Sequence, residues 1–185
     1  METYSIQLAL PEHLEQLQQI EYISASRFSS ETLPLPIRNR VISLEEHTRA
    51  QAAGQLWVAL AENEQPIGFA LVHVVNMMAY LAEIDVHPNY GCRGIGNALI
   101  TTIIQWAKNK HLHCIGLTTF THIPWNAPFY KKLGFESVDV HRCPEYLVQV
   151  LIKESEDGLQ NRTAMILKLC EAPEQLKQSR LDNTS

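Results

Sequence analysis

A glycine-rich turn carries the strongest chemical signal in the sequence. It reads Gly91-Cys92-Arg93-Gly94-Ile95-Gly96 and joins an expected strand to an expected helix. Glycines allow successive backbone N–H groups to point into one concavity, and the N-terminus of the following helix adds partial positive charge. Such a turn is suited to a phosphate or pyrophosphate group. The alternative interpretation is a plain tight turn between a strand and a helix.

Two common phosphate-binding motifs do not fit this turn. A P-loop requires Lys followed by Ser or Thr after its last glycine, whereas Asn97 and Ala98 follow Gly96. The dinucleotide fingerprint requires a third glycine and an acidic residue about 20 positions later. Leu99 takes the place of that glycine, and the stretch around Cys114 has no Asp or Glu. The sequence therefore disfavours a nicotinamide-dependent oxidoreductase.

The elements that must position the turn predict a mixed α/β fold. Strands are expected at 4–10, 56–61, 67–75, 80–86, 114–120, 135–141 and 163–169. Helices are expected after Pro11, from a capping box at Ser43 to Gly54, after the glycine turn, and at 127–133 and 144–154, with a loop at 29–36. Hairpins and a crossover helix together indicate a mixed central sheet with helices on both faces.

The amino-acid composition indicates a globular protein. The 185 residues are 45% hydrophobic and 19% charged, which is typical of a globular chain. We expect one domain over 1–170 and a polar tail over 171–185. The net charge of −5 and the lack of a Lys/Arg run argue against a nucleic-acid partner. No signal peptide or bilayer-spanning stretch is predicted, so no membrane partner is expected.

The four cysteines lie far apart, with no C-x-x-C pair. This spacing favours reduced thiols in a cytoplasmic protein over a disulfide framework or a zinc site. No metal cofactor is expected.

Two blocks of sequence resemble the GNAT acyltransferase superfamily. Residues 83–99 are similar to its acetyl-CoA motif, and Phe129-Tyr130-Lys131-Lys132-Leu133-Gly134-Phe135 is similar to its F-Y-x-K-x-G-F segment. The resemblance covers the expected elements from about 4 to 169. It implies a GNAT-type sheet splayed between its fourth and fifth strands, with acetyl-CoA as cosubstrate.

The sequence departs from the family pattern at two positions. Gly91 stands where the family has Gln or Arg, which removes one phosphate donor, and Arg93 is the substitute that we expect to supply the charge. Ile123 stands where the family often has Asn, seven residues before Tyr130. Asn126 is then the candidate to cap the helix and touch the pantetheine arm of the cosubstrate.

The resemblance also implies roles for individual residues. Backbone groups of 84–86 would hold the amide-bearing arm, with the Val86 N–H facing the thioester oxygen. Tyr130 would protonate the leaving thiolate as general acid; aromatic packing is its alternative. The implied cofactor-binding residues are Ile84, Asp85, Val86, Gly91, Cys92, Arg93, Gly94, Ile95, Gly96, Asn126 and Tyr130, and the implied catalytic ones are Tyr130 and Glu83.

The general base stays open at this point. Glu83 is the first candidate because its strand meets the thioester, although an exposed strand face would also explain a glutamate there. His122, which follows the fifth strand, is the second candidate, and a water chain is the third. Asp85 alternates onto the same face as Glu83 and could tune it.

The resemblance implies that the acceptor enters opposite the cosubstrate. It would be bordered by 27–38 and by the insertion at 141–158, which either shapes a pocket or forms a homodimer contact. The function expected is acetyl transfer to the primary amine of a small molecule or peptide, by direct attack in a ternary complex. A non-catalytic acyl-CoA-binding sensor or interaction module is the alternative.

Overall fold

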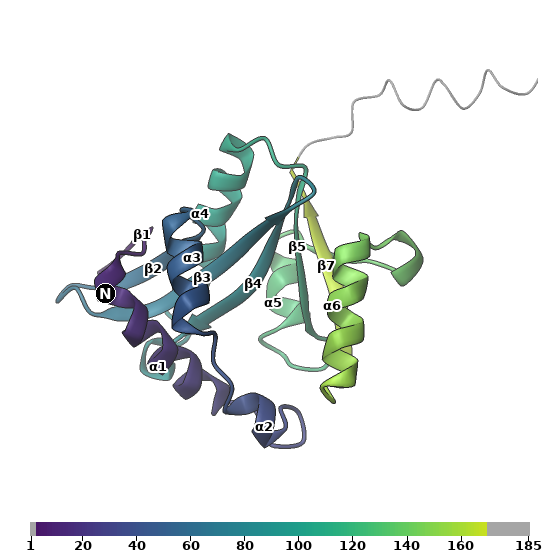
Figure 1. Ribbon diagram of the computed structural model, residues 1–185, viewed down its shortest axis with the longest axis horizontal. Helices are drawn as coiled ribbons and strands as arrows, with labels where there is room; N and C mark the ends of the chain where they lie inside the picture. Colours follow the sequence, from purple (N-terminus) through teal and green to yellow (C-terminus); the bar gives the residue numbers. More distant parts are fainter. Residues whose placement is uncertain (1–2, 170–185) are drawn as a thin grey trace, which may run out of the picture.

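The computed structural model describes residues 3–169, and its centre is a seven-stranded sheet in the order β1-β2-β3-β4-β5-β7-β6 (Figure 1). The strands are β1 (Tyr4–Leu8), β2 (Leu56–Ala61), β3 (Pro66–Val75), β4 (Met78–Val86), β5 (Cys114–Phe120), β6 (Glu136–Ser137) and β7 (Arg162–Lys168). All neighbouring pairs are antiparallel except β4 and β5, which are parallel. The expected mixed sheet is confirmed.

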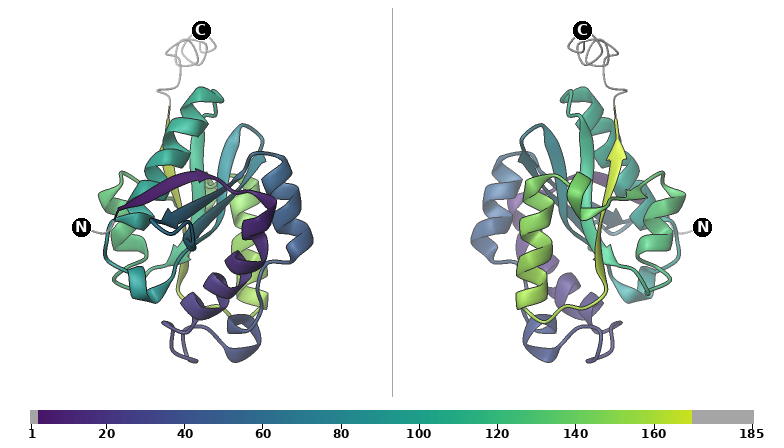
Figure 2. Two further views of the ribbon diagram at one scale, coloured as in Figure 1. Left: turned by 90° about the vertical axis from the view of Figure 1, so that its left-hand side faces the viewer. Right: turned by 90° about the vertical axis from the view of Figure 1, so that its right-hand side faces the viewer.

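Helices cover both faces of the sheet (Figure 2). One face carries α1 (Leu14–Ala25), α3 (Leu44–Ala52) and α6 (Glu145–Glu156), and the other carries α4 (Ile95–Asn109) and α5 (Ala127–Lys132). The short α2 (Leu35–Arg38) follows α1, and the 3-10 turns are η1 (Pro11–His13), η2 (Pro88–Tyr90) and η3 (Val140–Arg142). Alternation along β2 divides the core: Val58 packs on the α1 side, and Trp57 packs on the α4 side.

The parallel pair β4–β5 is short, and this opens the sheet. The two strands are paired only where Met78–Tyr80 meets Cys114–Gly116. Beyond that point β4 continues to Val86 and β5 to Phe120 without pairing. The splay between the fourth and fifth strands, expected from the family resemblance, is therefore present.

A β-bulge in β4 decides which side chains face which side of the sheet. Leu71 of β3 pairs with Glu83, while its neighbour Val72 pairs with Leu81, so Ala82 is an extra residue. An extra residue shifts the alternation of the strand. As a result Ile84 and Val86 pack with the α4-side core.

Two sequence expectations about the elements were wrong. The strand expected at 135–141 is only β6 (Glu136–Ser137), because the Asp139 side chain accepts a hydrogen bond from the His141 N–H at 2.9 Å and starts η3 instead. The loop expected at 29–36 runs into α2, where proline lies in the first turn. The other predicted helix and strand boundaries agree with the structure within about two residues. The predicted tail at 171–185 lies outside the described residues.

The Ser43 capping box is confirmed, since the Ser43 hydroxyl accepts the Glu46 N–H at 3.2 Å. Within 3–169, none of the helices has the length and apolar character needed to cross a bilayer.

Gly68 should tolerate no side chain, because it lies against the backbone of β4. A Cβ at this position would be 2.9 Å from the Asp85 carbonyl oxygen. We expect Gly68→Ala to lower the free energy of unfolding by about 1–3 kcal/mol, measured by urea denaturation. At Gly116 the nearest atoms are the flexible ends of Met78 and Leu147, so Gly116→Ala should cost less. An equal or smaller cost for Gly68→Ala would contradict this prediction.

His47 should make the fold sensitive to acid. Its ring is fully buried, packs edge-on against Phe69 at 5.5 Å, and has no hydrogen-bond partner on either nitrogen. Burial lowers the pKa of His47 below 6.5. Below this pH the unfolded chain binds a proton that the folded chain does not, so stability falls as pH falls.

We therefore expect His47→Leu to reduce the loss of unfolding free energy between pH 7.5 and 5, measured by urea denaturation. The exposed His113→Leu serves as the control and should leave that loss unchanged. The same acid sensitivity in wild type and His47→Leu would show that this histidine is not its source.

Candidate active site

A cavity of about 500 Å³ fills the splay between β4 and β5. Its walls come from the diverging strands, the glycine turn, α5, the C-terminal part of α1, α2 and the end of α6. It therefore reaches from the α4 side of the sheet to the α1 side. Of the predicted site residues and candidate bases, only Arg93 and His122 do not line this cavity.

The glycine turn forms one end of the cavity and leads into α4. Gly94 lies at the N-cap with φ of 84°, and Cys92 also has a positive φ of 59°. Glycine adopts this left-handed conformation without strain, which explains its presence here. Because the N-cap residue is glycine, it offers no side-chain acceptor to the first-turn N–H groups of α4. An anion at this end would find both backbone donors and the positive end of the helix dipole.

The Arg93 side chain lies away from the main cavity. Its Nη2 donates to the Asn89 carbonyl at 2.9 Å, and the guanidinium stacks 5.2 Å above the Tyr90 ring. Arg93 lines a separate, smaller cavity with Tyr4 and Glu62. Its expected role as the substitute donor for Gly91 stays a prediction.

The edge of β4 offers backbone groups to the cavity. On one side Ile84, Asp85 and Val86 pair with β3. The other side has no strand partner beyond Tyr80, because β5 has diverged. An unpaired strand edge presents N–H and C=O groups that an extended, amide-bearing ligand can satisfy.

Tyr130 is held in the wall of the cavity by α5. Asn126 occupies the N-cap, and its carbonyl accepts the Tyr130 N–H at 3.2 Å, but its side chain makes no capping hydrogen bond. The Tyr130 ring is 8% exposed and packs against Phe129 and Phe135. Burial, together with the charge of Glu83, raises the pKa of Tyr130 above its usual 10. The phenol therefore keeps its proton at neutral pH, as a general acid must.

The two acidic residues of β4, Glu83 and Asp85, both line the cavity. Burial raises the pKa of Glu83, whose Oε1 accepts its neighbour's Ile84 N–H at 3.2 Å. Burial and the charges of Glu83 and Glu21 raise the pKa of Asp85 well above its usual value. A carboxylate with a raised pKa is a stronger base, which suits Glu83 to proton abstraction. His122 is not among the lining residues, and its ring packs against Phe120 at 5.8 Å.

Sequence reasoning missed a polar cluster at the α6 side of the cavity. Arg162 donates two hydrogen bonds to Glu154, at 2.6 and 2.9 Å, and Thr118 donates to the same carboxylate at 2.6 Å. The Arg162 guanidinium also lies 4.5 Å above the Phe120 ring. No local motif marks these residues, because they come from α6, β5 and β7 and meet only through the fold.

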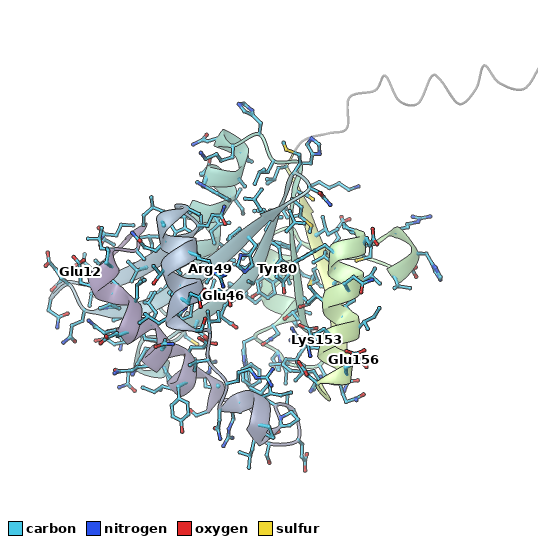
Figure 3. The ribbon with its side chains drawn as sticks, viewed as in Figure 1. Glu12, Glu46, Arg49, Tyr80, Lys153 and Glu156 are labelled. Atoms are coloured by element: carbon cyan, nitrogen blue, oxygen red, sulfur yellow. The ribbon has the colours of Figure 1, made fainter. Side chains whose placement is uncertain are left out.

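Tyr80 connects this cluster to the outer face between α3 and α6 (Figure 3). Its hydroxyl interacts with Thr118, and its ring packs on Tyr146 of α6 at 5.1 Å. On the other side it stacks with His73, whose Nε2 lies 3.2 Å from a Glu46 carboxylate oxygen of α3. These contacts anchor α6 beside the last residues that pair β4 with β5.

Glu21 of α1 was also missed, although it lines the cavity. Glutamate on a helix usually faces solvent, so its type gave no signal. The cavity rim beyond it is apolar and aromatic, with Phe28 packed on Phe120 and Trp125. Within the described chain, no three His, Cys, Asp or Glu residues are grouped so as to hold a metal ion.

Comparison with known proteins identifies relatives of this chain. Residues 14–135 match the model of the acetyltransferase (GNAT) family. An uncharacterized N-acetyltransferase of Methanocaldococcus jannaschii is 34% identical over 85 residues, which is 42% of this chain and 38% of the relative. The ribosomal protein bS18-alanine N-acetyltransferase of Haemophilus influenzae is 33% identical over 93 residues, which is 50% of this chain and 62% of the relative. The matches thus span less than two thirds of either relative.

Solved structures support the fold. The PaiA N-acetyltransferase of Thermoplasma acidophilum, solved with coenzyme A, superposes with a TM-score of 0.66 at 23% identity, covering 90% of this chain and 99% of the other. The family model covers the cavity's β4 edge, its glycine turn and Tyr130. The chain therefore belongs to the GNAT acetyltransferase family.

Proposed function

We propose that this protein is an acetyl-CoA-dependent N-acetyltransferase that acts on a primary amine by direct attack in a ternary complex. The observation that carries the proposal is the unpaired β4 edge, with the glycine turn at one end of the cavity and buried Tyr130 in its wall. We infer a single catalytic domain over 1–170; the cytoplasmic location and the homodimer stay predictions.

The donor half of the cavity would take acetyl-CoA. The pyrophosphate would bind at the turn from Gly91 to Gly96, whose backbone amides adjoin the N-terminus of α4. The pantetheine amides would pair with the free edge of β4 at Ile84, Asp85 and Val86. Asn126 lines the same cavity and is our candidate for a further contact with this arm.

The transfer requires stabilisation of an oxyanion, protonation of a thiolate and deprotonation of an ammonium group. The amine nitrogen attacks the thioester carbonyl, and the carbon–sulfur bond then breaks as the amide forms. The Val86 N–H would stabilise the oxyanion, and such a donor contributes about 2.7–4 kcal/mol in a dry site. Tyr130 would give its proton to the leaving thiolate. Glu83, directly or through water, would take the proton that the ammonium group must lose before attack. The second nitrogen proton, lost as the amide forms, would return to Tyr130 and restore its phenol.

The acceptor half would lie on the α1 side, bordered by α2 and the end of α6. The Haemophilus influenzae relative is named as an N-acetyltransferase of a ribosomal protein bS18 alanine, so a peptide beginning with alanine is one acceptor that we propose to test. A small amine is the other. The rim of Phe28, Leu33 and Ile37 would pack against an apolar part of either.

We expect saturable binding of acetyl-CoA, but not of NADH, in calorimetric titrations. Cys92 gives an independent footprint, because it is an exposed, free thiol that lines the cavity. Acetyl-CoA should slow alkylation of Cys92 by iodoacetamide, followed by peptide mass spectrometry. Cys143 lies outside the lining and should react equally with and without acetyl-CoA. No binding by a folded sample would overturn the proposed function.

Tyr130→Phe tests the general acid. We expect kcat for thiol release to fall about 10²–10⁴-fold with acetyl-CoA binding unchanged, because only the proton donor is removed. Tyr22→Phe, on an exposed tyrosine of α1, is the control. Unchanged turnover in Tyr130→Phe would remove this residue from the mechanism.

A non-catalytic acyl-CoA sensor is the alternative function. It predicts acetyl-CoA binding and Cys92 protection, but no thiol release with any amine. Screening alanine peptides and small diamines by thiol release therefore separates the two functions.

A further inference from the structure

Glu21 is a buried carboxyl group that the proposed chemistry has not yet used. It lies in α1, is 8% exposed, and lines the cavity opposite the β4 edge. A carboxylic acid is seldom buried without a specific partner or function.

The hydrogen bond that Glu21 makes within the protein uses only part of the capacity of its carboxyl group. Both Glu21 oxygens lie near the Ile42 N–H, at 3.1 and 3.0 Å. A single N–H donor satisfies one of about four acceptor positions on a carboxylate. Glu21 can therefore hold the chain before α3 in place and still accept hydrogen bonds from a ligand in the cavity.

Glu21 shares the cavity with two further carboxyl groups, whose charges interact with it. These are Glu83 and Asp85, which the bulge turns toward α1. The link between the elements is direct, because the Ser24 hydroxyl of α1 donates to the Val86 carbonyl of β4 at 3.1 Å. Like charges at such a place repel each other, so ionisation of one opposes ionisation of the next.

The carboxyl groups of Glu21, Glu83 and Asp85 have no ion-pair partner among the described residues. The fourth carboxyl of the cavity, Glu154, differs, since Arg162 holds it in a bidentate pair. The cavity thus keeps one paired carboxylate and three that lack a cationic partner of their own.

We propose that Glu21 is a further residue of the acceptor site, where it acts with Glu83 as counter-ion to the acceptor's ammonium group. This inference rests on the proposed function. An ammonium group has three N–H donors, which match carboxylate oxygens on two sides of the cavity. The acceptor class that fits is a primary amine that binds as a cation.

Binding of the acceptor changes the protonation of Glu21. Burial and the charge of Glu83 raise the pKa of Glu21 to about 8, so it mainly carries a proton at pH 7 in the empty site. A bound cation favours the ionised carboxylate, so Glu21 releases this proton to solvent when the acceptor binds. The acceptor's own proton then passes to Glu83 before attack.

Other charged side chains also act on these carboxyl groups. Glu46 of α3 adds to the repulsion that Glu21 feels, and Arg162 of β7 and Arg27 of α1 act on Glu83 and Asp85 respectively. The remaining charged residues that line the cavity are Arg38, Arg40 and Glu154. None of these is altered in the variants below.

The test is calorimetric titration of 1,4-diaminobutane and of alaninamide into the protein–CoA complex at pH 7. CoA without its acetyl group allows binding but no transfer. Titrations in PIPES and in Tris, which differ in ionisation enthalpy, report the protons exchanged. We expect release of up to about one proton per bound amine in the wild type. The uncharged butane-1,4-diol should bind more weakly than the diamine.

Glu21→Gln keeps an oxygen for the Ile42 N–H, so the fold should persist. We expect this variant to lose the proton release and to bind the amines about tenfold or more weakly, with acetyl-CoA binding unchanged. Glu21→Asp should keep part of the release. Glu15→Gln, on the exposed face of the same helix, is the matched control and should behave as wild type.

Two outcomes would overturn the inference. One is equal proton release and affinity in wild type and Glu21→Gln. The other is no binding of either cation to a chain that binds CoA. Both would leave the proposed CoA-dependent function standing, which fails instead if acetyl-CoA itself does not bind.

Discussion

The loss of hydrogen bonding between β4 and β5 after Tyr80 and Gly116 is the constraint on which the rest of the site depends. A sheet interior normally satisfies every backbone N–H and C=O, and here one strand edge is left to face a cavity. Side chains pack on both sides of this opening. Tyr130 fills the α5 side, and the Glu154–Arg162 pair with Thr118 fills the α6 side.

The bulge at Ala82 turns this opening into two different surfaces. It sends Ile84 and Val86 toward the α4 core and leaves Glu83 and Asp85 on the α1 side. One strand therefore supplies both an unpaired backbone edge and two acidic side chains to the cavity. A strand with regular alternation across this point would place these groups on the wrong sides.

Local sequence signals predicted the parts of the site that are built from contiguous residues. The glycine turn, the start of α4 and the F-Y-x-K-x-G-F helix all appear where their spacing indicated. The pattern could not reveal Glu21 or the Glu154–Arg162 pair, because these side chains become close only when α1 and α6 pack on the sheet. The strand expected after Phe135 failed for a local reason, since the Asp139 side chain competes with the edge pairing of β6.

The absence of a side chain at Gly116 has a consequence for how this enzyme family can diversify. A Cβ there would lie 2.9 Å from the Leu147 side chain of α6, so the inserted helix rests directly on the sheet at the base of the splay. The region matched by the family ends at residue 135, before α6 begins. The α6 wall of the cavity is thus encoded in a segment that is separate in the sequence from the glycine turn and the β4 edge. That segment can therefore be lengthened, replaced or reshaped in evolution without changing the glycine turn or the β4 edge.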